Sequence, residues 1–219
     1  MSERLPKPMS DDAPRHAPRH VARRGRPRKF DRDEALERAM QVFWTHGYDA
    51  TSMQHLTAGM SINSPSIYAA FGSKEALFRE AVDRYVRQEA EVAWRALDET
   101  EGLREAVRLM LRASLDVFVA NTPPRGCLVV LGAGHLDAGS DPVRGFLRDQ
   151  RRHFRVRIEA RLARAVSEGE LPDDSDLLGL SECLLAFFSG LAIEAVDGAD
   201  LDALYRSVEM FCTGMLPLN

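Results

Sequence analysis

The chain has 219 residues and a formal net charge of −4. Hydrophobic residues make up 45% and charged residues 28% of it, an ordinary composition for one or two globular domains. The negative charge argues against a nucleic-acid-binding protein, whose usual signature is a basic domain. The charge is unevenly distributed, however. Residues 1–30 carry nine basic and three acidic side chains, a net charge of +6, which leaves −10 for the rest.

The cysteine content and the hydropathy disfavour several other classes. Three scattered cysteines, Cys127, Cys183 and Cys212, are too few for a disulfide framework or a zinc cluster and fit a reducing compartment. The N-terminus lacks the apolar segment of a signal peptide. The most apolar run, Cys183 to Val196, is shorter than the roughly 18 apolar residues of a membrane span. We therefore expect a cytoplasmic protein with no membrane partner.

Residues 1–29 are rich in proline, arginine and histidine and show no apolar periodicity, so we expect a disordered basic arm. The arm ends in Arg24-Gly25-Arg26-Pro27-Arg28-Lys29, and its Gly-Arg-Pro core resembles the minor-groove hook of architectural DNA-binding proteins. A narrow A·T-rich minor groove concentrates negative potential and attracts arginine. A solvated basic tail is the alternative interpretation. The position of the arm directly before three short helices favours the hook.

From Asp31 onwards, the sequence predicts helices nearly throughout. Each of three short helices follows a residue that caps helix N-termini: Asp31 or Asp33, Thr51 or Ser52, and Asn63 or Ser64. The first helix is expected to end at Gly47, and the third has Pro65 in its first turn. A fourth helix is expected over residues 74–97, capped by Ser73. Short helices joined by tight turns within about fifty residues form the helix-turn-helix layout.

The block from Phe30 to Phe78 also carries a specific string of residues: Ala35-Leu36, Ala39, Phe43, Gly47-Tyr48, Thr51-Ser52, Leu56, Pro65-Ser66-Ile67-Tyr68-Ala69-Ala70-Phe71 and Ser73-Lys74-Glu75-Ala76-Leu77-Phe78. In this order and spacing, the block resembles the DNA-binding domain of the tetracycline-repressor (TetR/AcrR) family of bacterial transcriptional regulators. One turn position, Ser61, holds serine where the family usually has glycine. A positive φ at this position is costly for serine.

The resemblance implies that the third helix enters the major groove of DNA. Its exposed side chains would be short apart from one tyrosine: Ser64, Pro65, Ser66 and Tyr68. None is an Arg, Lys, Asn or Gln that reads base edges strongly, so we expect modest direct readout. Four further residues lie where they could reach phosphates, at or near helix N-termini: Thr51, Ser52, Gln54 and Lys74. Residues 31–78 have a net charge of −3, so the arm is expected to supply most of the attraction to DNA.

The rest of the chain predicts further helices at residues 101–120, 126–136, 142–168, 175–197 and 200–216, without strand-like alternation. We therefore expect an all-α fold. It comprises the arm (1–29), a three-helix helix-turn-helix domain (30–78) and a helical domain for effector binding and dimerisation (79–219). Amphipathic or apolar residues near the expected core are candidates for a pocket, although each is more often plain core: Trp94, Met110, Phe118, Cys127, Phe154 and Phe188.

The segment Arg125-Gly126-Cys127-Leu128 resembles an element of one subset of TetR-like regulators. A reactive thiol needs access to solvent and a lowered pKa. The apolar run that follows Cys127 indicates burial, so a tightly packed helix start is favoured over a redox sensor. A metal site of Cys127 with His135 lacks a third ligand, and no cofactor motif is found.

Two runs of opposite charge lie in the predicted C-terminal helices. Residues 144–164 carry eight arginines and two acids, whereas residues 173–202 carry eight acids and no base. Pairing of the two runs, within or between subunits, is favoured over a second nucleic-acid surface or an anionic ligand. Exposed ion pairs of this kind contribute little stability each.

The last two predicted helices are rich in apolar residues. The first of them is apolar on nearly every face, which predicts burial on every face. TetR-like proteins dimerise through a four-helix bundle of their final helices, which implies an interface on six residues: Leu184, Phe188, Leu191, Leu204, Val208 and Phe211. A purely internal core helix is the alternative.

These features predict a ligand-responsive DNA-binding regulator rather than an enzyme, since neither a phosphate-binding loop nor a nucleophile elbow is found. The expected protein is a homodimeric repressor that a small-molecule effector releases from a palindromic operator on double-stranded DNA. Two alternatives stay open: an effector-independent architectural DNA-binding protein, and an all-helical enzyme with a vestigial DNA-binding domain.

Overall fold

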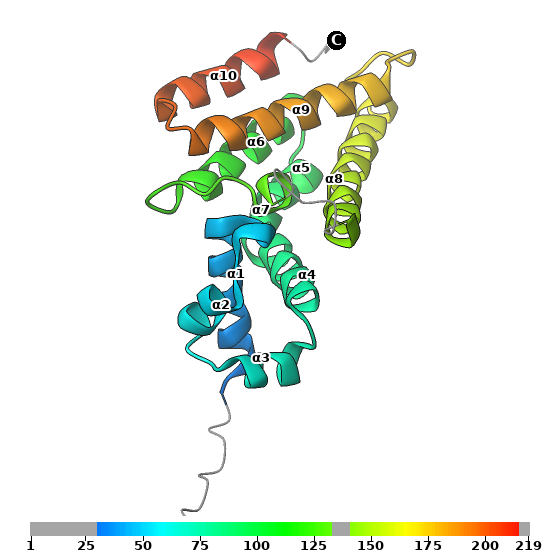
Figure 1. Cartoon of the computed structure of the whole chain (residues 1–219). Helices are drawn as coiled ribbons and strands as arrows, with labels where there is room; N and C mark the ends of the chain where they lie inside the picture. The colour runs from blue at the N-terminus through cyan, green and yellow to red at the C-terminus, as the bar shows by residue number, and fades with distance from the viewer. Residues whose placement is uncertain (1–29, 133–140, 215–219) are drawn as a thin grey trace, which may run out of the picture.

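A computed structural model describes residues 30–132 and 141–214, and this part of the chain contains helices and no strands. The elements follow in the order α1 (Arg32–Ala50), α2 (Met53–Met60), α3 (Ser64–Phe71), α4 (Lys74–Tyr85), η1 (Val86–Ala90), α5 (Glu91–Glu99), α6 (Leu103–Val119), α7 (Leu128–Leu131), α8 (Asp141–Ser167), α9 (Leu177–Val196) and α10 (Leu201–Gly214). Figure 1 shows a head of α1–α4 below a helical body. The all-α prediction is confirmed.

The helices of the head begin at the predicted caps, and the structure decides between the alternatives. The Asp31 carboxylate accepts hydrogen bonds from the backbone N–H groups of the first turn of α1. Ser52 caps α2, Asn63 caps α3 and Ser73 caps α4. Each of these side chains satisfies a backbone donor that the helix itself leaves free. The local sequence therefore fixes where the head helices begin.

Two turns of the head contain positive φ angles. Gly47 has φ 70° and ψ 178°, and it kinks α1 where the sequence predicts an end, while the helix resumes up to Ala50. Ser61 has φ 57° and ψ 36° in the turn between α2 and α3. A left-handed serine is costly because its Cβ crowds the following carbonyl group. The strain expected from the absent glycine is therefore present.

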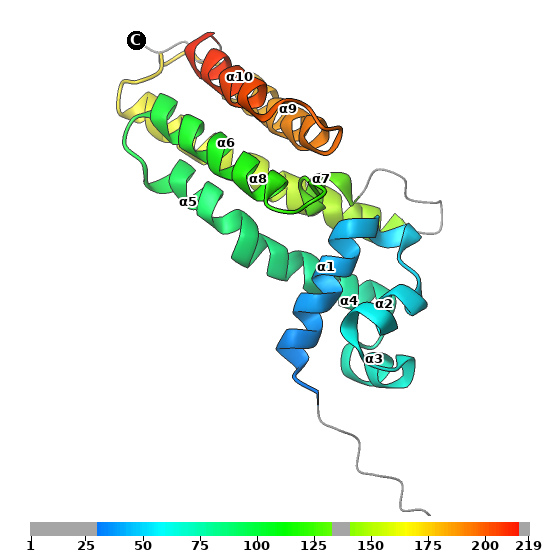
Figure 2. The ribbon, with the colours of Figure 1, turned by 90° about the vertical axis from the view of Figure 1, so that its left-hand side faces the viewer.

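The head and the body are joined by one long helical run. It comprises α4, η1 and α5, where a helix over residues 74–97 was expected, and Figure 2 shows it passing from the head along one side of the body. Its middle part, Val86–Ala90, is a π-helix that the sequence did not predict. Such π segments are rare and mark positions where a helix deviates from regular geometry.

The body consists of layers of helices. In Figure 2, α6 and α8 lie between α5 on one side and α9 with α10 on the other. The aromatic rings at the centre contact one another, with centroids 4.4 Å apart for Trp94 and Phe154, and 5.5 Å apart for Phe118 and Phe188. Helix α7 is shorter than the predicted 126–136, and residues 133–140 lie outside the described residues.

Helix α9 is long and apolar enough to cross a membrane, by length and composition alone. Ser189 and Glu194 interrupt the apolar run of α9, which is why the sequence predicted no membrane-spanning segment there. One face of α9 packs on the body through residues such as Leu184 and Leu191, and 28% of its most apolar window is buried. Its outer face exposes Leu178 (60%) and Ile193 (46%). A single apolar helix of this kind is weak evidence for a membrane span, because core helices share its composition.

We expect Ser61→Gly to raise the free energy of unfolding by about 1 kcal/mol, because glycine adopts the left-handed conformation without steric cost. Ala58→Gly, on an exposed position of α2 with ordinary helical geometry, is the matched control and should lower the stability by about 1 kcal/mol. Urea denaturation measures both changes. Equal destabilisation by the two substitutions would contradict strain at Ser61.

Candidate nucleic-acid interface and its junction with the body

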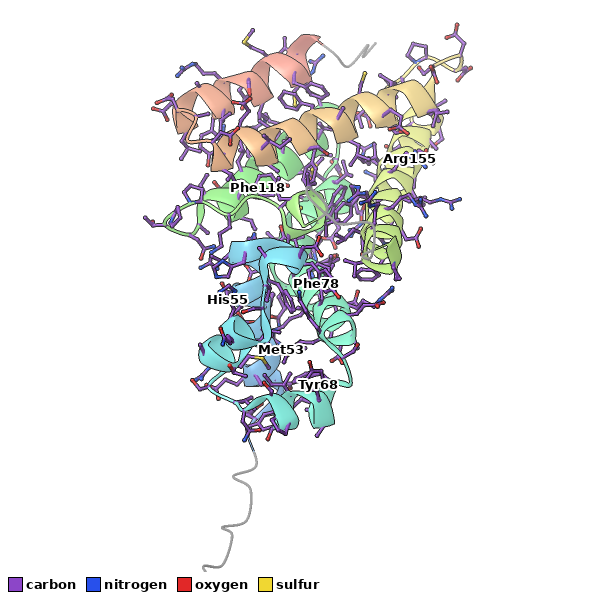
Figure 3. The ribbon with its side chains drawn as sticks, in the orientation of Figure 1. Met53, His55, Tyr68, Phe78, Phe118 and Arg155 are labelled. Carbon is purple, nitrogen blue, oxygen red and sulfur yellow. The ribbon has the colours of Figure 1, made fainter. Side chains whose placement is uncertain are left out.

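Helix α3 presents a small exposed surface at the end of the molecule farthest from α9 and α10. Figure 3 shows Tyr68 at this end, and its side chain is 47% exposed. Pro65 is exposed, and Ser64 and Ser66 are half-buried. The opposite face of the helix anchors it through buried Ile67 and Phe71. The helix therefore shows hydroxyl groups and one phenol ring to a partner.

Helix α2 lies beside this surface and begins with a reciprocal capping arrangement. The backbone N–H of His55 donates to the Ser52 hydroxyl, and His55 Nδ1 accepts from the Ser52 backbone N–H. Ser52, Gln54 and His55 are exposed. The rings of His55 and His46 also stack, with centroids 4.8 Å apart. The start of α2 is thus an ordered, solvent-facing edge of the head.

Thr51 does not belong to this edge, contrary to the prediction. Its side chain is fully buried, and its hydroxyl donates to the carbonyl oxygen of Gly47. The sequence showed two adjacent hydroxyl residues with equal capping ability. Ser52 caps α2, and the Thr51 hydroxyl instead forms a hydrogen bond inside the head, at the kink of α1.

Lys74 lies at the first position of α4, half-buried against the aromatic ring of Tyr48. Its Nζ lies 4.4 Å from the ring centroid. Burial lowers the pKa of Lys74, and the negative charge of Asp49 opposes the shift. The ammonium group is thus held in place by the ring, at the end of α4 that has free backbone N–H groups.

Little other positive charge is free in the described head. Arg32 pairs with Glu80 at 2.8 Å, and Arg38 pairs with Glu34 at 2.6 Å. The predicted arm residues Arg24, Arg26, Arg28 and Lys29 lie outside the described residues. The head alone therefore offers a nucleic-acid phosphate little beyond Lys74 and the helix N-termini.

A hydrogen bond joins the head to the body at one loop. The indole Nε1 of Trp44 donates to the carbonyl oxygen of Gly126 over 2.9 Å, and the Trp44 ring contacts the edge of Tyr85 with centroids 4.9 Å apart. Arg125 lies over Trp44, 5.9 Å from the ring centroid, and donates to the side-chain oxygen of Gln41. Helices α1 and α4 therefore meet the α6–α7 loop at this point.

Polar side chains extend the contact across the head. Glu37 accepts from Gln41 over 3.0 Å and from Arg84 on α4 over 2.6 Å. Burial raises the pKa of Glu37, but the hydrogen bonds from Arg84 and Gln41 outweigh it and leave the pKa below its ordinary value. A continuous chain of polar contacts thus runs from α4 through α1 to Arg125.

Gly126 fits this loop because it has no side chain. Its φ is +62°, and a methyl group on it would lie 2.5 Å from Leu131 Cδ1 and 2.6 Å from the carbonyl oxygen of Ala192. Distances this short require the backbone of α9 to move. The carbonyl group that receives the Trp44 hydrogen bond is therefore fixed between the head, α7 and α9.

The six predicted pocket residues lie in the core. Trp94, Met110, Phe118, Cys127, Phe154 and Phe188 are at most 2% exposed. Burial raises the pKa of the Cys127 thiol, although hydrogen bonds with Tyr85 and two backbone N–H groups oppose the shift. A buried thiol with a raised pKa is a poor nucleophile. The packing favours the interpretation of all six as core residues.

Comparisons with known proteins match both parts of this architecture. Residues 35–81 match the model of bacterial regulatory proteins of the tetR family, and residues 102–211 match a tetracyclin repressor-like C-terminal domain. The chain is 33% identical to the HTH-type transcriptional repressor ComR of Escherichia coli over 184 residues, which are 84% of this chain and 88% of ComR. The chain belongs to the TetR family of transcriptional regulators.

Solved structures agree with this assignment. A cysteine mutant of the TetR family regulator CifR, complexed with 26-base-pair operator DNA, has 39% identity and a TM-score of 0.83. The match covers 88% of this chain and all of that one. NemR of Escherichia coli in its reduced form, at 18% identity and a TM-score of 0.66, shares the fold. The family consists of transcription regulators, so the protein is a regulator with a helix-turn-helix DNA-binding domain, not an enzyme.

Five of the six residues predicted for the TetR-type dimer interface belong to the core of one chain. Leu184, Phe188, Leu191, Leu204 and Val208 are at most 7% exposed, and Phe211 is half-buried against Phe187. For these five residues the prediction was wrong, because the most regular apolar stripe marks the face toward the core. The apolar residues that α9 and α10 leave exposed lie elsewhere on these helices: Leu178, Ile193, Val196, Leu201 and Met210.

The arginine-rich run of α8 forms ion pairs within the chain, mostly with acids outside the predicted acidic run. Arg155 pairs with Glu182 on α9, which is one contact between the two predicted runs. Arg157 instead pairs with Glu91 and Asp98 of α5, and buried Arg161 pairs with Glu170. The run therefore holds α8 mainly against α5 and the α8–α9 loop rather than against the acidic segment.

We expect Gly126→Ala to lower the free energy of unfolding by about 3 kcal/mol. The strain of alanine at a positive φ and the steric clash of its methyl group with the backbone of α9 both contribute to this cost. Gly198→Ala is the matched control: Gly198 has φ +83° with no atom near its would-be methyl group, so the cost should be about 1 kcal/mol. Thermal or urea denaturation measures the difference. Similar costs for the two variants would show that the close contact is unimportant.

Proposed function

We propose that the protein is a homodimeric transcriptional repressor that binds palindromic operator DNA in the bacterial cytoplasm and leaves it when a small-molecule effector binds residues 79–219. The observation that supports this most is the similarity along 88% of the chain to CifR, whose structure contains double-stranded operator DNA. ComR is named as a transcriptional repressor, which supports repression rather than activation as the proposed mode of regulation. A helix-turn-helix whose α3 faces away from the body has the geometry for this role.

In this proposal, α3 enters the major groove. Ser64, Pro65, Ser66 and Tyr68 meet base edges and thymine methyl groups, and Ser52, Gln54 and Lys74 contact phosphates. Such side chains give weaker discrimination than a bidentate arginine or asparagine. Because Arg32 and Arg38 of the head are paired with carboxylates, the arm, residues 1–29, is the main source of free positive charge. The arm is proposed to reach the adjacent minor groove.

The homodimer is proposed to form through the outer face of α9 and α10. These helices expose Ile193 and Met210 (75%), and Ala186 and Gly190 lie on the same side of α9 as Ile193 at helical spacing, so a second copy can approach closely. A two-fold interface would bury this apolar surface and place two heads on one duplex. Once one head is bound, the second binds intramolecularly, so two weak reading heads reach useful affinity together.

Deletion of residues 1–29 is expected to weaken operator binding and to flatten its salt dependence. If Arg24, Arg26, Arg28 and Lys29 each contact one phosphate, the slope of log K against log salt loses about three to four units per protomer. Binding would be measured on an operator selected from random DNA. Neutralising Arg4 and Lys7, far from the head in sequence, is the control. An unchanged slope in the truncated protein would rule out this role of the arm.

The same selected operator tests the alternative of an architectural DNA-binding protein. Footprinting of a regulator should show a discrete two-fold protected site that a member of a small-molecule panel removes. Diffuse protection of A·T-rich DNA, insensitive to the panel, would instead favour the architectural function.

Ile193→Glu is expected to weaken the dimer by about two orders of magnitude, because an unpaired charge buried at an interface costs about 3 kcal/mol. Val92→Glu is the matched control, because Val92 is 67% exposed and belongs to α5, which lies on the opposite side of the body from α9 and α10. Sedimentation equilibrium gives the dissociation constants. A dimer that tolerates Ile193→Glu as well as Val92→Glu would place the interface elsewhere.

A further inference from the structure

We propose that the effector binds in a groove between the C-terminal end of α1 and the α6–α7 loop, and that it is a small aromatic carboxylate. This inference rests on the proposed effector-responsive function and names the site and the ligand class. We call the site the junction groove. It lies outside the aromatic core of the body, between the part that binds DNA and the part that carries the proposed dimer face.

The junction groove exists in the structure with a volume of about 390 Å³. Trp44 and His46 of α1 line it on the head side, and Pro123, Pro124 and Leu131 line it on the body side. A further hollow of about 320 Å³ continues along α1 and shares His46 and Leu131 with it. This size is at the lower end of the roughly 300–1,000 Å³ of small-molecule sites.

The charge at the groove points to an anion. Arg125 lines the groove, and burial lowers the pKa of its guanidinium. In the described part of the chain, no carboxylate pairs with it, and its hydrogen-bond partner is the neutral amide of Gln41. A half-buried guanidinium without a counter-ion favours a carboxylate that can accept two parallel hydrogen bonds.

The apolar walls point to a ring attached to that carboxylate. Trp44, Pro123 and Pro124 all line the groove, so its walls are largely apolar rings. A planar ring packs against such surfaces with favourable dispersion and burial. A single or fused aromatic ring fits the volume, and its carboxylate then lies at the Arg125 end.

The position of the groove couples ligand binding to the head. In the structure, Arg125 donates to Gln41, and Trp44 donates to Gly126. A carboxylate that takes the guanidinium from Gln41 breaks one of these links, and a ring beside Trp44 displaces α1 from the loop. The ligand therefore makes different contacts when α1 is joined to the loop and when α1 is displaced from it. This difference is the requirement for shifting the populations of the two states. The π-helix that directly follows Tyr85 lies in the helical run between head and body.

The aromatic core is a poorer site for the same ligand. Trp94, Phe154 and Phe188 contact one another there, and the rings of Trp94 and Phe154 lie 4.4 Å apart and nearly parallel. A ligand would have to separate rings that already bury each other. The junction groove needs no such opening, although binding there has to displace part of α1 for a response.

The test uses the two tryptophans of the chain. In the full-length Trp94→Phe variant, Trp44 is the remaining tryptophan and reports on the groove. Benzoates and naphthoates are titrated without DNA, next to the corresponding amides as uncharged probes. We expect saturable quenching of Trp44 by the carboxylates, at least tenfold weaker for the amides. The same carboxylates should release the selected operator.

Arg125→Gln in the same background is expected to weaken carboxylate binding at least tenfold and to leave amide binding unchanged. Arg112→Gln is the matched control, because Arg112 also lies over an aromatic ring, that of Tyr205, and faces α10 rather than the groove. Thermal denaturation checks that both variants fold. Direct ligand binding and ligand-free operator binding are measured separately.

Three results would overturn the inference. The first is no quenching of Trp44 by any carboxylate at millimolar concentration. The second is carboxylate binding that survives Arg125→Gln. The third is operator release by a panel compound that leaves Trp44 unquenched, which places the effector elsewhere and keeps the proposed function. Failure of operator binding without any ligand would instead contradict the proposed function, whatever the titration of Trp44 shows.

Discussion

The joint between the head and the body depends on one loop that contacts α1, α7 and α9. The carbonyl group of Gly126 accepts the indole hydrogen bond of Trp44, while its Cα faces Leu131 and the backbone of Ala192. Any side chain at this position would push α9 away from the loop, so the contact requires glycine. Because the same few residues contact α1, α7 and α9, the orientation of the head relative to the body is set here. In this chain, the joint between head and body thus depends locally on a single hydrogen bond and a missing methyl group.

The head could be predicted from sequence because local chemistry determines it. Asp31, Asn63 and Ser73 cap their helices where the pattern places them, and the strain at Ser61 follows from one absent glycine. Local chemistry was insufficient where two residues offered the same group. Thr51 and Ser52 could each cap α2, and the choice came from the space beside Gly47. The π-helix of Val86–Ala90 likewise has no local signal, since its residues suit an ordinary helix.

The partner-facing surfaces were harder to predict, because burial is decided by tertiary contacts. The apolar stripe of α9 and α10 predicted a contact between chains, but its residues lie in the core of one chain. A small-residue face such as Ala186 and Gly190 has little apolar signal in sequence. The junction groove combines α1 with a loop eighty residues away, so no spacing rule connects Trp44 to Arg125. The net charge of the chain became informative about DNA binding once it was counted separately for the arm and for the rest of the chain.

The chemistry of α3 bears on how such a regulator responds. In the proposed homodimer, hydroxyl groups and one phenol give each head little sequence discrimination, so occupancy of an operator would depend on two heads binding at once. In that regime, an effector does not need to block a base contact. A change in the distance between the heads is sufficient, because it removes the advantage of intramolecular binding. The proposed ligand, bound between α1 and the Gly126 loop, would act at the base of the head, where a displacement of α1 is passed on to α3.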